Sequence, residues 1–267
     1  MIRRMVGNRF FLIAQDDHAK LAGKLAGHWG NDRFSRPDPM ESTILGTTLH
    51  DCGWPLHDLA PTLNNNGLPR DVFETPRGIA LRVWTASVNQ AAGRDAYAEL
   101  LVSLHVLFLS IHATISDPVD RFEINKFQHQ QVELQEKLRR RLRLRTDLPL
   151  KLGMADDPSD NQEQWLRLNF RLLQALDLIS LAMCCTQPPF SKTREVWDRP
   201  DGIPVSLTMN RVDERTVRVS PWPFDQPFIE LEVPYRAVEA RQYEDEEAFQ
   251  QEFAAVPIEK LNLKATI

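Results

Sequence analysis

The chain has 267 residues, of which 42% are hydrophobic and 26% are charged, and its formal net charge is −5. This length is enough for one large hydrophobic core, alone or with a small appendage. The negative charge argues against a nucleic-acid partner held by bulk electrostatic attraction, although it leaves small nucleotides open as ligands.

Residues 1–14 are expected to form a β-hairpin, because two apolar runs flank the turn residues Gly7-Asn8. From Asp17 the apolar period changes to that of a helix, with Asp16 or Asp17 as its cap and Gly30-Asn31 as its end. A second helix is predicted over residues 42–51. Gly53 and Pro55 cannot continue it, so His50 falls at its C-terminal end.

Residues 56–76 are rich in proline and asparagine and predict a long loop. The helical period returns in four later segments, and the last of them is the most apolar. These segments are residues 77–90, 95–116, 120–146 and 161–185. The third ends in the basic run 139–145, which is typical of a solvated helix face.

After Pro188-Pro189 the pattern becomes that of short strands, at residues 205–209, 216–220, 228–234 and 261–267. We therefore expect a mainly α-helical (α+β) protein. Its helical bundle and N-terminal hairpin would occupy residues 1–195. Residues 196–267 would form a small antiparallel sheet packed on the bundle, which could recruit the hairpin.

No secretory signal or membrane-spanning segment is predicted, because the apolar stretches are too short or too polar. The three cysteines are Cys52 and the adjacent pair Cys184-Cys185, an arrangement poorly suited to ordinary disulfides. A cytoplasmic location and no membrane partner are therefore expected.

Four residues stand out for their chemistry: His18, the pair His50-Asp51, and Asp177 within the apolar run 172–183. An unpaired carboxylate in so apolar a helix would cost several kcal/mol, so Asp177 needs a cation. Imidazole and carboxylate groups together are typical ligands of a divalent transition metal, and helical proteins hold such ions between facing helices.

The order His18, His50-Asp51, Asp177 resembles the HD superfamily of metal-dependent phosphohydrolases. The segments 15–19, 50–54 and 221–224 also resemble a bacterial domain family of unknown function with an HD-like core. The resemblance implies an HD-like helical bundle that hydrolyses a phosphate ester or anhydride with a metal-activated water.

In that mechanism a first ion would be held by His18, His50, Asp51 and Asp177. A second ion, or the phosphate, would be bound by His105, with His112 as a weaker candidate. One or two ions of Mn, Fe, Co, Ni or Zn are expected. Asp51 or Asp58 would move protons. The ligand would be a small phosphorylated molecule or a nucleotide, and the sequence leaves a homodimer open.

Each of these residues also has a structural interpretation. Asp177 could pair with an arginine such as Arg171, and His50 could simply favour a helix C-terminus. His18 could pack at the start of its helix, and His105 could be a hydrogen-bonded core histidine. A second His-Asp pair, His57-Asp58, lies in the predicted loop and lacks the apolar helix that the motif requires.

Two rival functions follow from these interpretations. If the pocket binds its ligand without catalysis, the protein is a small-molecule or nucleotide sensor. If the histidines only fill the core, it is an interaction scaffold. Metal content separates the scaffold from the other two, and turnover separates the enzyme from the sensor.

Overall fold

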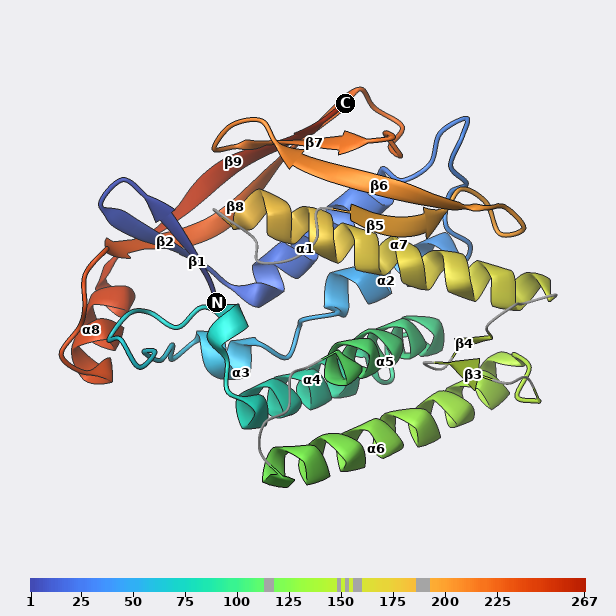
Figure 1. The fold of residues 1–267 in the computed structure, drawn as a ribbon, viewed down its shortest axis with the longest axis horizontal. Helices are drawn as coiled ribbons and strands as arrows, with labels where there is room; N and C mark the ends of the chain where they lie inside the picture. The colour runs from blue at the N-terminus through green and yellow to red at the C-terminus, as the bar shows by residue number, and fades with distance from the viewer. Residues whose placement is uncertain (113–117, 148–149, 152–153, 156–159, 186–192) are drawn as a thin grey trace.

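The computed structural model describes residues 1–112, 118–147, 150–151, 154–155, 160–185 and 193–267 (Figure 1). The helices in this part of the chain are α1 (Gln15–Gly27), α2 (Met40–Leu49), α3 (Pro55–Asp58), α4 (Arg77–Ala91), α5 (Ala96–Ile111), α6 (Pro118–Leu142), α7 (Asn161–Cys184) and α8 (Glu246–Ala255), with a 3-10 turn, η1 (Val72–Glu74). None of them has the length and apolar composition of a membrane span.

The strands of the described residues are β1 (Ile2–Val6), β2 (Arg9–Ile13), β3 (Leu150–Lys151), β4 (Met154–Ala155), β5 (Thr193–Trp197), β6 (Pro204–Arg211), β7 (Thr216–Ser220), β8 (Phe228–Glu239) and β9 (Ile258–Thr266). Seven of them form one sheet in the order β1-β2-β8-β9-β7-β6-β5, and β3 pairs with β4. Neighbours in the large sheet are antiparallel except β7 and β9, which are parallel.

The prediction of a mainly helical bundle with a small sheet is therefore wrong. The structure is a mixed α/β fold, and its seven-stranded sheet takes strands from both ends of the chain (Figure 1). The predicted N-terminal hairpin is present, and β2 joins it to β8. The predicted division between residues 195 and 196 stays a prediction.

Strand β8 shows why the sheet was underestimated. The β-rich pattern predicted this strand only as far as Pro234, a residue that cannot donate a ladder hydrogen bond. In the structure β8 pairs with β9 over residues 228–236, and β2 pairs with it only from Arg236 onward. Pro234 therefore pairs with β9 on one side of β8 and lies before the stretch that β2 pairs on the other side. The strand continues past it to Glu239.

One face of the sheet packs on α1 and α7 (Figure 1). Alternating side chains of β6, such as Val205, Leu207 and Met209, are buried there, as expected for a sheet with one covered face. These strands and the apolar faces of α1 and α7 form the main core. A second core joins α4, α5 and α6 on the other side of α2.

The helices follow the predicted segments closely, with a few differences at their ends. Helix α1 begins at Gln15 without a side-chain cap, and Asp16 and Asp17 bind Lys20 instead of capping it. The predicted loop 56–76 contains η1, and α3 includes His57 and Asp58. Residues 113–116 of the predicted helix 95–116 lie outside the described residues, as do Pro188 and Pro189. Helix α8 and strands β3, β4 and β5 were not predicted.

Candidate functional site

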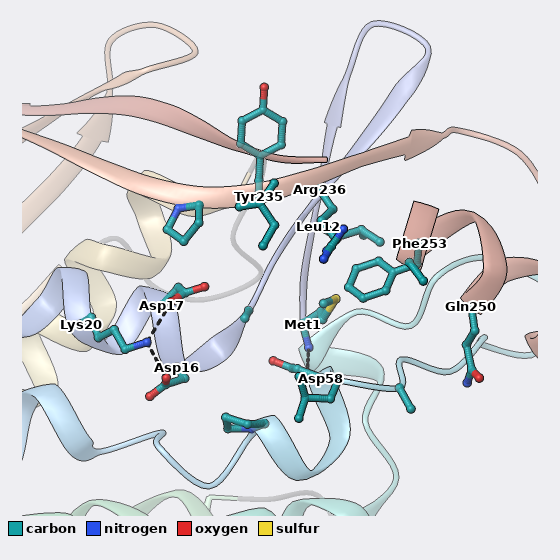
Figure 2. Close-up of a pocket in the computed structure, with 17 residues that line it drawn as sticks. Met1, Leu12, Asp16, Asp17, Lys20, Asp58, Tyr235, Arg236, Gln250 and Phe253 are labelled. Atoms are coloured by element: carbon teal, nitrogen blue, oxygen red, sulfur yellow. Dashed lines mark hydrogen bonds and ion pairs between the residues drawn. The ribbon is translucent and has the colours of Figure 1, made fainter. Parts of the chain in front are cut away.

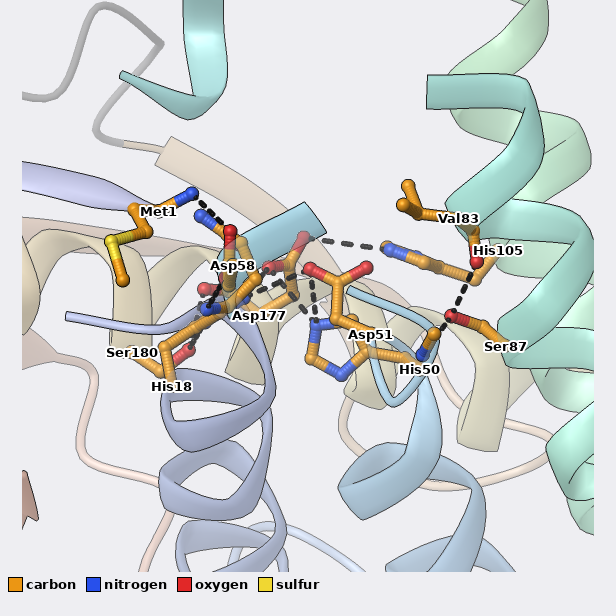
Figure 3. A network of polar contacts seen from close by, with 12 residues as sticks. Met1, His18, His50, Asp51, Asp58, Val83, Ser87, His105, Asp177 and Ser180 are labelled. Atoms are coloured by element: carbon orange, nitrogen blue, oxygen red, sulfur yellow. Dashed lines mark hydrogen bonds and ion pairs between the residues drawn. The ribbon is translucent and has the colours of Figure 1, made fainter. Parts of the chain in front are cut away.

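Helices from distant parts of the sequence bring five of the predicted residues together (Figure 3). His18 comes from α1, His50 and Asp51 from the end of α2, His105 from α5 and Asp177 from α7. One ligand atom from each of His18, His50 and Asp51 lies within 4.8 Å of the other two, and the same holds for His50, His105 and Asp177. His50 belongs to both groups, so the five residues form one cluster.

The Nε2 atoms of the three histidines face the two carboxylates. His18 Nε2 lies 3.1 Å from Asp51 Oδ2, and His50 Nε2 lies 3.5 Å from Asp177 Oδ1. His105 Nε2 lies 3.9 Å from Asp177 Oδ2. The imidazole rings of His18 and His105 meet that of His50 edge to face, at centroid distances of 5.1 and 5.0 Å.

Hydrogen bonds on the far side of the rings fix two of these orientations. His50 Nδ1 donates to the Thr47 carbonyl at 2.7 Å. Ser180 Oγ donates to the Asp177 carbonyl and is therefore free to accept from His18 Nδ1 at 2.9 Å. A hydrogen on Nδ1 leaves the Nε2 lone pair of a neutral imidazole for a cation, and metal-binding histidines are commonly held in this way.

Sequence reasoning missed Ser180, although helical spacing could have indicated it, because Ser180 follows Asp177 by one turn and lies on the same helix face. The contact of His50 with Thr47 is made by the backbone carbonyl, so it does not depend on which residue stands at that position.

Several polar atoms in the cluster are buried without a hydrogen-bond partner among the described residues. They include His50 Nε2 and Asp51 Oδ1. Buried polar groups nearly always have a hydrogen-bond partner, so unpartnered polar atoms gathered at one place indicate a binding site for an ion or a ligand. A divalent ion fits the mixed nitrogen and oxygen donors of this cluster.

The electrostatics of the cluster also favour a cation. Burial would lower the pKa of His50, but the carboxylates of Asp51 and Asp177 outweigh it and raise that pKa to about 9. Burial would raise the pKa of each carboxyl group, yet the neighbouring histidines lower both. Burial lowers the pKa of His105 to about 4, so its imidazole is neutral. A pKa of about 9 leaves His50 protonated at neutral pH, so a metal ion bound at its Nε2 would have to replace that proton. The two carboxylates of the cluster retain their negative charge.

Among the described residues Asp177 forms no salt bridge with an arginine, although its charge acts on Arg194 at longer range. Arg171 Nη1 donates to Gln174 at 3.0 Å instead. The side chain of Asp177 is 15% exposed, and its charge is balanced by the histidines of the cluster.

The other predicted residues lie beside the cluster. Asp58 accepts from the Met1 amino group and from the Gln15 backbone amide, both at 2.8 Å, so both of its carboxylate oxygens are engaged (Figure 3). His112 caps α5 in an exposed position, with Nδ1 bonded to the Phe108 carbonyl at 2.8 Å. The structure does not bring either of them into the group of converging ligand atoms.

Two cavities flank this region. A cavity of about 360 Å³ reaches Asp51, His105 and Asp177, and His112 is also in its lining. A larger one, of about 570 Å³, is lined by Asp58 and by Lys20, which binds Asp16 and Asp17 (Figure 2). Only the smaller of these two reaches the cluster, so we call it the cluster cavity.

Comparison with known proteins gives a family but no activity. The search of curated proteins and the search of solved structures each gave no significant match. Residues 1–240 match the family model described as protein of unknown function DUF3891. Because this match covers most of the sequence, the chain belongs to the DUF3891 family.

Proposed function

We propose that this protein is a metal-dependent phosphohydrolase that cleaves a phosphate ester or anhydride. The observation that carries the proposal is the convergence of two oriented imidazoles, His18 and His50, with the carboxylates of Asp51 and Asp177. The order of these residues is the one that the resemblance to the HD superfamily implies.

His18, His50, Asp51 and Asp177 would hold a divalent transition-metal ion of the Mn, Fe, Co, Ni or Zn type. Such an ion, when bound, lowers the pKa of a water ligand toward neutrality and draws electron density from a phosphoryl oxygen. His105 is placed to contribute to a second ion or to bind a phosphate oxygen, because its Nε2 faces the second oxygen of Asp177.

The chain's own groups would orient the reactants and handle protons. Asp51 Oδ1 has no hydrogen-bond partner among the described residues, and Asp51 lines the cluster cavity. Asp51 is the carboxylate that we propose as the acceptor of a proton from the attacking water. Trp54, Trp84 and Leu181 form apolar walls there, which would limit the access of bulk water to the reacting group.

A catalytically silent sensor is the second candidate, and the position of Asp58 favours it. The oxygens of this predicted proton carrier already accept hydrogen bonds from Met1 and Gln15. The metal and the phosphorylated ligand would then bind without turnover.

Metal content and hydrolysis, measured together, test the proposal. We expect one or two transition-metal ions per chain in the wild type, near-complete loss in His50→Ala, and no loss in the control His129→Ala, whose side chain is 76% exposed on α6. Hydrolysis of p-nitrophenyl phosphate or of nucleotides should follow the metal. Absence of metal after supplementation would refute both functions, and bound metal without turnover across metals and substrates would select the sensor.

A further inference from the structure

Asp58 belongs to the second His-Asp pair of the sequence, and its carboxylate is buried although it lies outside the cluster. Its side chain is 4% exposed. Oδ2 accepts a hydrogen bond from the Gln15 backbone amide at 2.8 Å, and Oδ1 accepts one from the Met1 amino group at the same distance (Figures 2 and 3). Both contacts cross between elements, since Asp58 ends α3, Gln15 begins α1 and Met1 precedes β1.

The contact with Gln15 supplies a cap that α1 lacks. The first backbone amides of a helix have no acceptor within the helix, and a Ser, Thr, Asp or Asn side chain at the preceding residue usually provides one. The residue before α1 is Ala14, and the helix has no side-chain cap there. Asp58 provides an acceptor from α3 instead, with its negative charge at the positive end of the helix dipole. The start of α1 is therefore held against α3.

The contact with Met1 holds the neighbouring strand at the same point. Strands β1 and β2 pair with Ile2 opposite Ile13, so Met1 lies at the end of the hairpin from which the chain enters α1. The Met1 carbonyl also accepts a hydrogen bond from the Val72 amide of η1 at 2.7 Å. Asp58 therefore joins the end of the hairpin and the start of α1 to α3.

The position of His18 depends on where α1 begins. His18 follows Gln15 by three residues, which is about 4.5 Å along the helix axis. Its Nδ1 lies 2.9 Å from Ser180 Oγ, and its Nε2 lies 3.1 Å from Asp51 Oδ2, so its ring is held between α7 and the end of α2. Coordinating atoms need to lie within about 0.2 Å of their preferred distance from a metal, so a larger displacement of the first turn would impair His18 as a ligand.

We propose that Asp58 is a positioning residue of the metal site, which places His18 Nε2 for the ion by holding the first turn of α1. This assignment rests on the proposed function, because it concerns the ion that His18 would bind. It replaces proton transfer as the role of Asp58, since both oxygens of this carboxylate are engaged and neither joins the converging ligand atoms. The second His-Asp pair then supports the site that the first one forms.

A double-mutant cycle on Mn²⁺ affinity, measured by competition with a coloured chelator, tests the assignment. Asp58→Ala should weaken binding about tenfold, as is typical when a group that orients a ligand is lost. In a His18→Ala background the same change should alter the affinity by less than about twofold, because the ligand that Asp58 places is gone. In a His105→Ala background the full loss should return, since His105 lies on α5.

Two further variants separate positioning from general stability. Asp245→Ala is the matched control, since Asp245 caps α8 by accepting a hydrogen bond from the Ala248 amide at 2.8 Å. It should lower the stability of the fold and leave the metal affinity unchanged. Asp58→Asn keeps one acceptor oxygen and should therefore lose less affinity than Asp58→Ala. It replaces Asp58→Ala in the cycle if that variant does not fold.

The visible spectrum of bound Co²⁺ gives a second readout, because it depends on the geometry of the ligands. The spectrum should change in Asp58→Ala and stay that of the wild type in Asp245→Ala, and it decides the question if His18→Ala binds no metal. Wild-type protein that never takes up a metal refutes the proposed function. Metal-loaded Asp58→Ala with wild-type affinity and spectrum, or with the same loss of affinity in the His18→Ala background, overturns the positioning role and leaves the function standing.

Discussion

His50 Nε2 lies 3.5 Å from Asp177 Oδ1, and this contact joins the end of α2 to the middle of α7. The two residues belong to different packing units, since α7 covers the sheet and α2 separates it from α4, α5 and α6. The cluster therefore lies at the junction of the two cores. A cation bound there would link α2, α5 and α7, and would add to the hydrogen bond that His18 and Ser180 already make between α1 and α7.

We predict that a divalent metal raises the melting temperature of the wild type but not that of Asp177→Asn. A ligand that binds only the folded state adds about 2.7 kcal/mol at a hundred times its Kd. For a chain of this size that corresponds to a shift of roughly 5–10 °C. Differential scanning fluorimetry with Mn²⁺ or Zn²⁺, and with a chelator, measures it.

Asp225→Asn is the control for this experiment, because Asp225 also binds a histidine, His28, at 3.2 Å but lies outside the cluster. Its metal-induced shift should equal that of the wild type. An equal shift in Asp177→Asn would show that the metal binds elsewhere.

Ser180→Ala should weaken metal binding about tenfold while leaving the fold intact, because loss of a group that orients a ligand typically costs 10–100-fold in affinity. Ser180 holds His18 through Nδ1 and does not itself face the carboxylates. Competition with a chromogenic chelator measures the affinity.

Ser110→Ala removes a comparable buried serine, which bonds to the Leu107 carbonyl on α5. If both variants bind metal equally well, His18 does not need Ser180 for its orientation.

The residues of the cluster could be singled out from the sequence because their signals are local. His50-Asp51 ends an apolar helix, and Asp177 interrupts the most apolar segment of the chain. The predicted boundaries of α7 agree with the structure to within one residue, since a long periodic helix is the clearest pattern in a sequence. That these side chains meet depends on tertiary packing, which the sequence alone did not reveal.

What could not be predicted depends on distant partners. The sheet pairs β7 with β9 and β2 with β8, across long stretches of chain, and no local pattern specifies such pairings. Arg139 shows the same limit. It begins a basic run that we expected to be solvated, yet its side chain is fully buried against Glu163 of α7. The burial follows from a neighbour that periodicity does not identify.

Gly53→Ala should destabilise the protein by roughly 1–3 kcal/mol and weaken metal binding, as expected when a methyl group is forced into a packed site. A Cβ at Gly53 would lie 2.1 Å from the Val83 carbonyl and 2.5 Å from the Ser87 amide. The turn after Asp51 would have to move away from α4, taking this carboxylate with it.

Gly27→Ala provides the comparison, since a Cβ there meets nothing within 4 Å and the residue ends α1. Alanine at that position should be neutral or slightly stabilising. Urea unfolding and metal titration of both variants measure the two effects. A stable Gly53→Ala protein with normal metal affinity would mean that the close approach of this turn to α4 does not position Asp51.

Glu163→Gln should cost about 3–5 kcal/mol of unfolding free energy, because it leaves the charge of Arg139 buried beside a neutral partner. The pair joins α6 to the first turn of α7, with Arg139 Nη2 at 3.1 Å from Glu163 Oε2 and side chains 0% and 1% exposed.

Glu136→Gln is the matched control, since its pair with Arg140 is 55–60% exposed and worth at most about 1 kcal/mol. Urea denaturation of the two variants measures the difference. Because Glu163 lies in the first turn of α7, 14 residues before Asp177, the folded fraction of Glu163→Gln should keep its metal affinity. Equal stability of the two variants would mean that the interior of this region admits enough water to solvate Arg139.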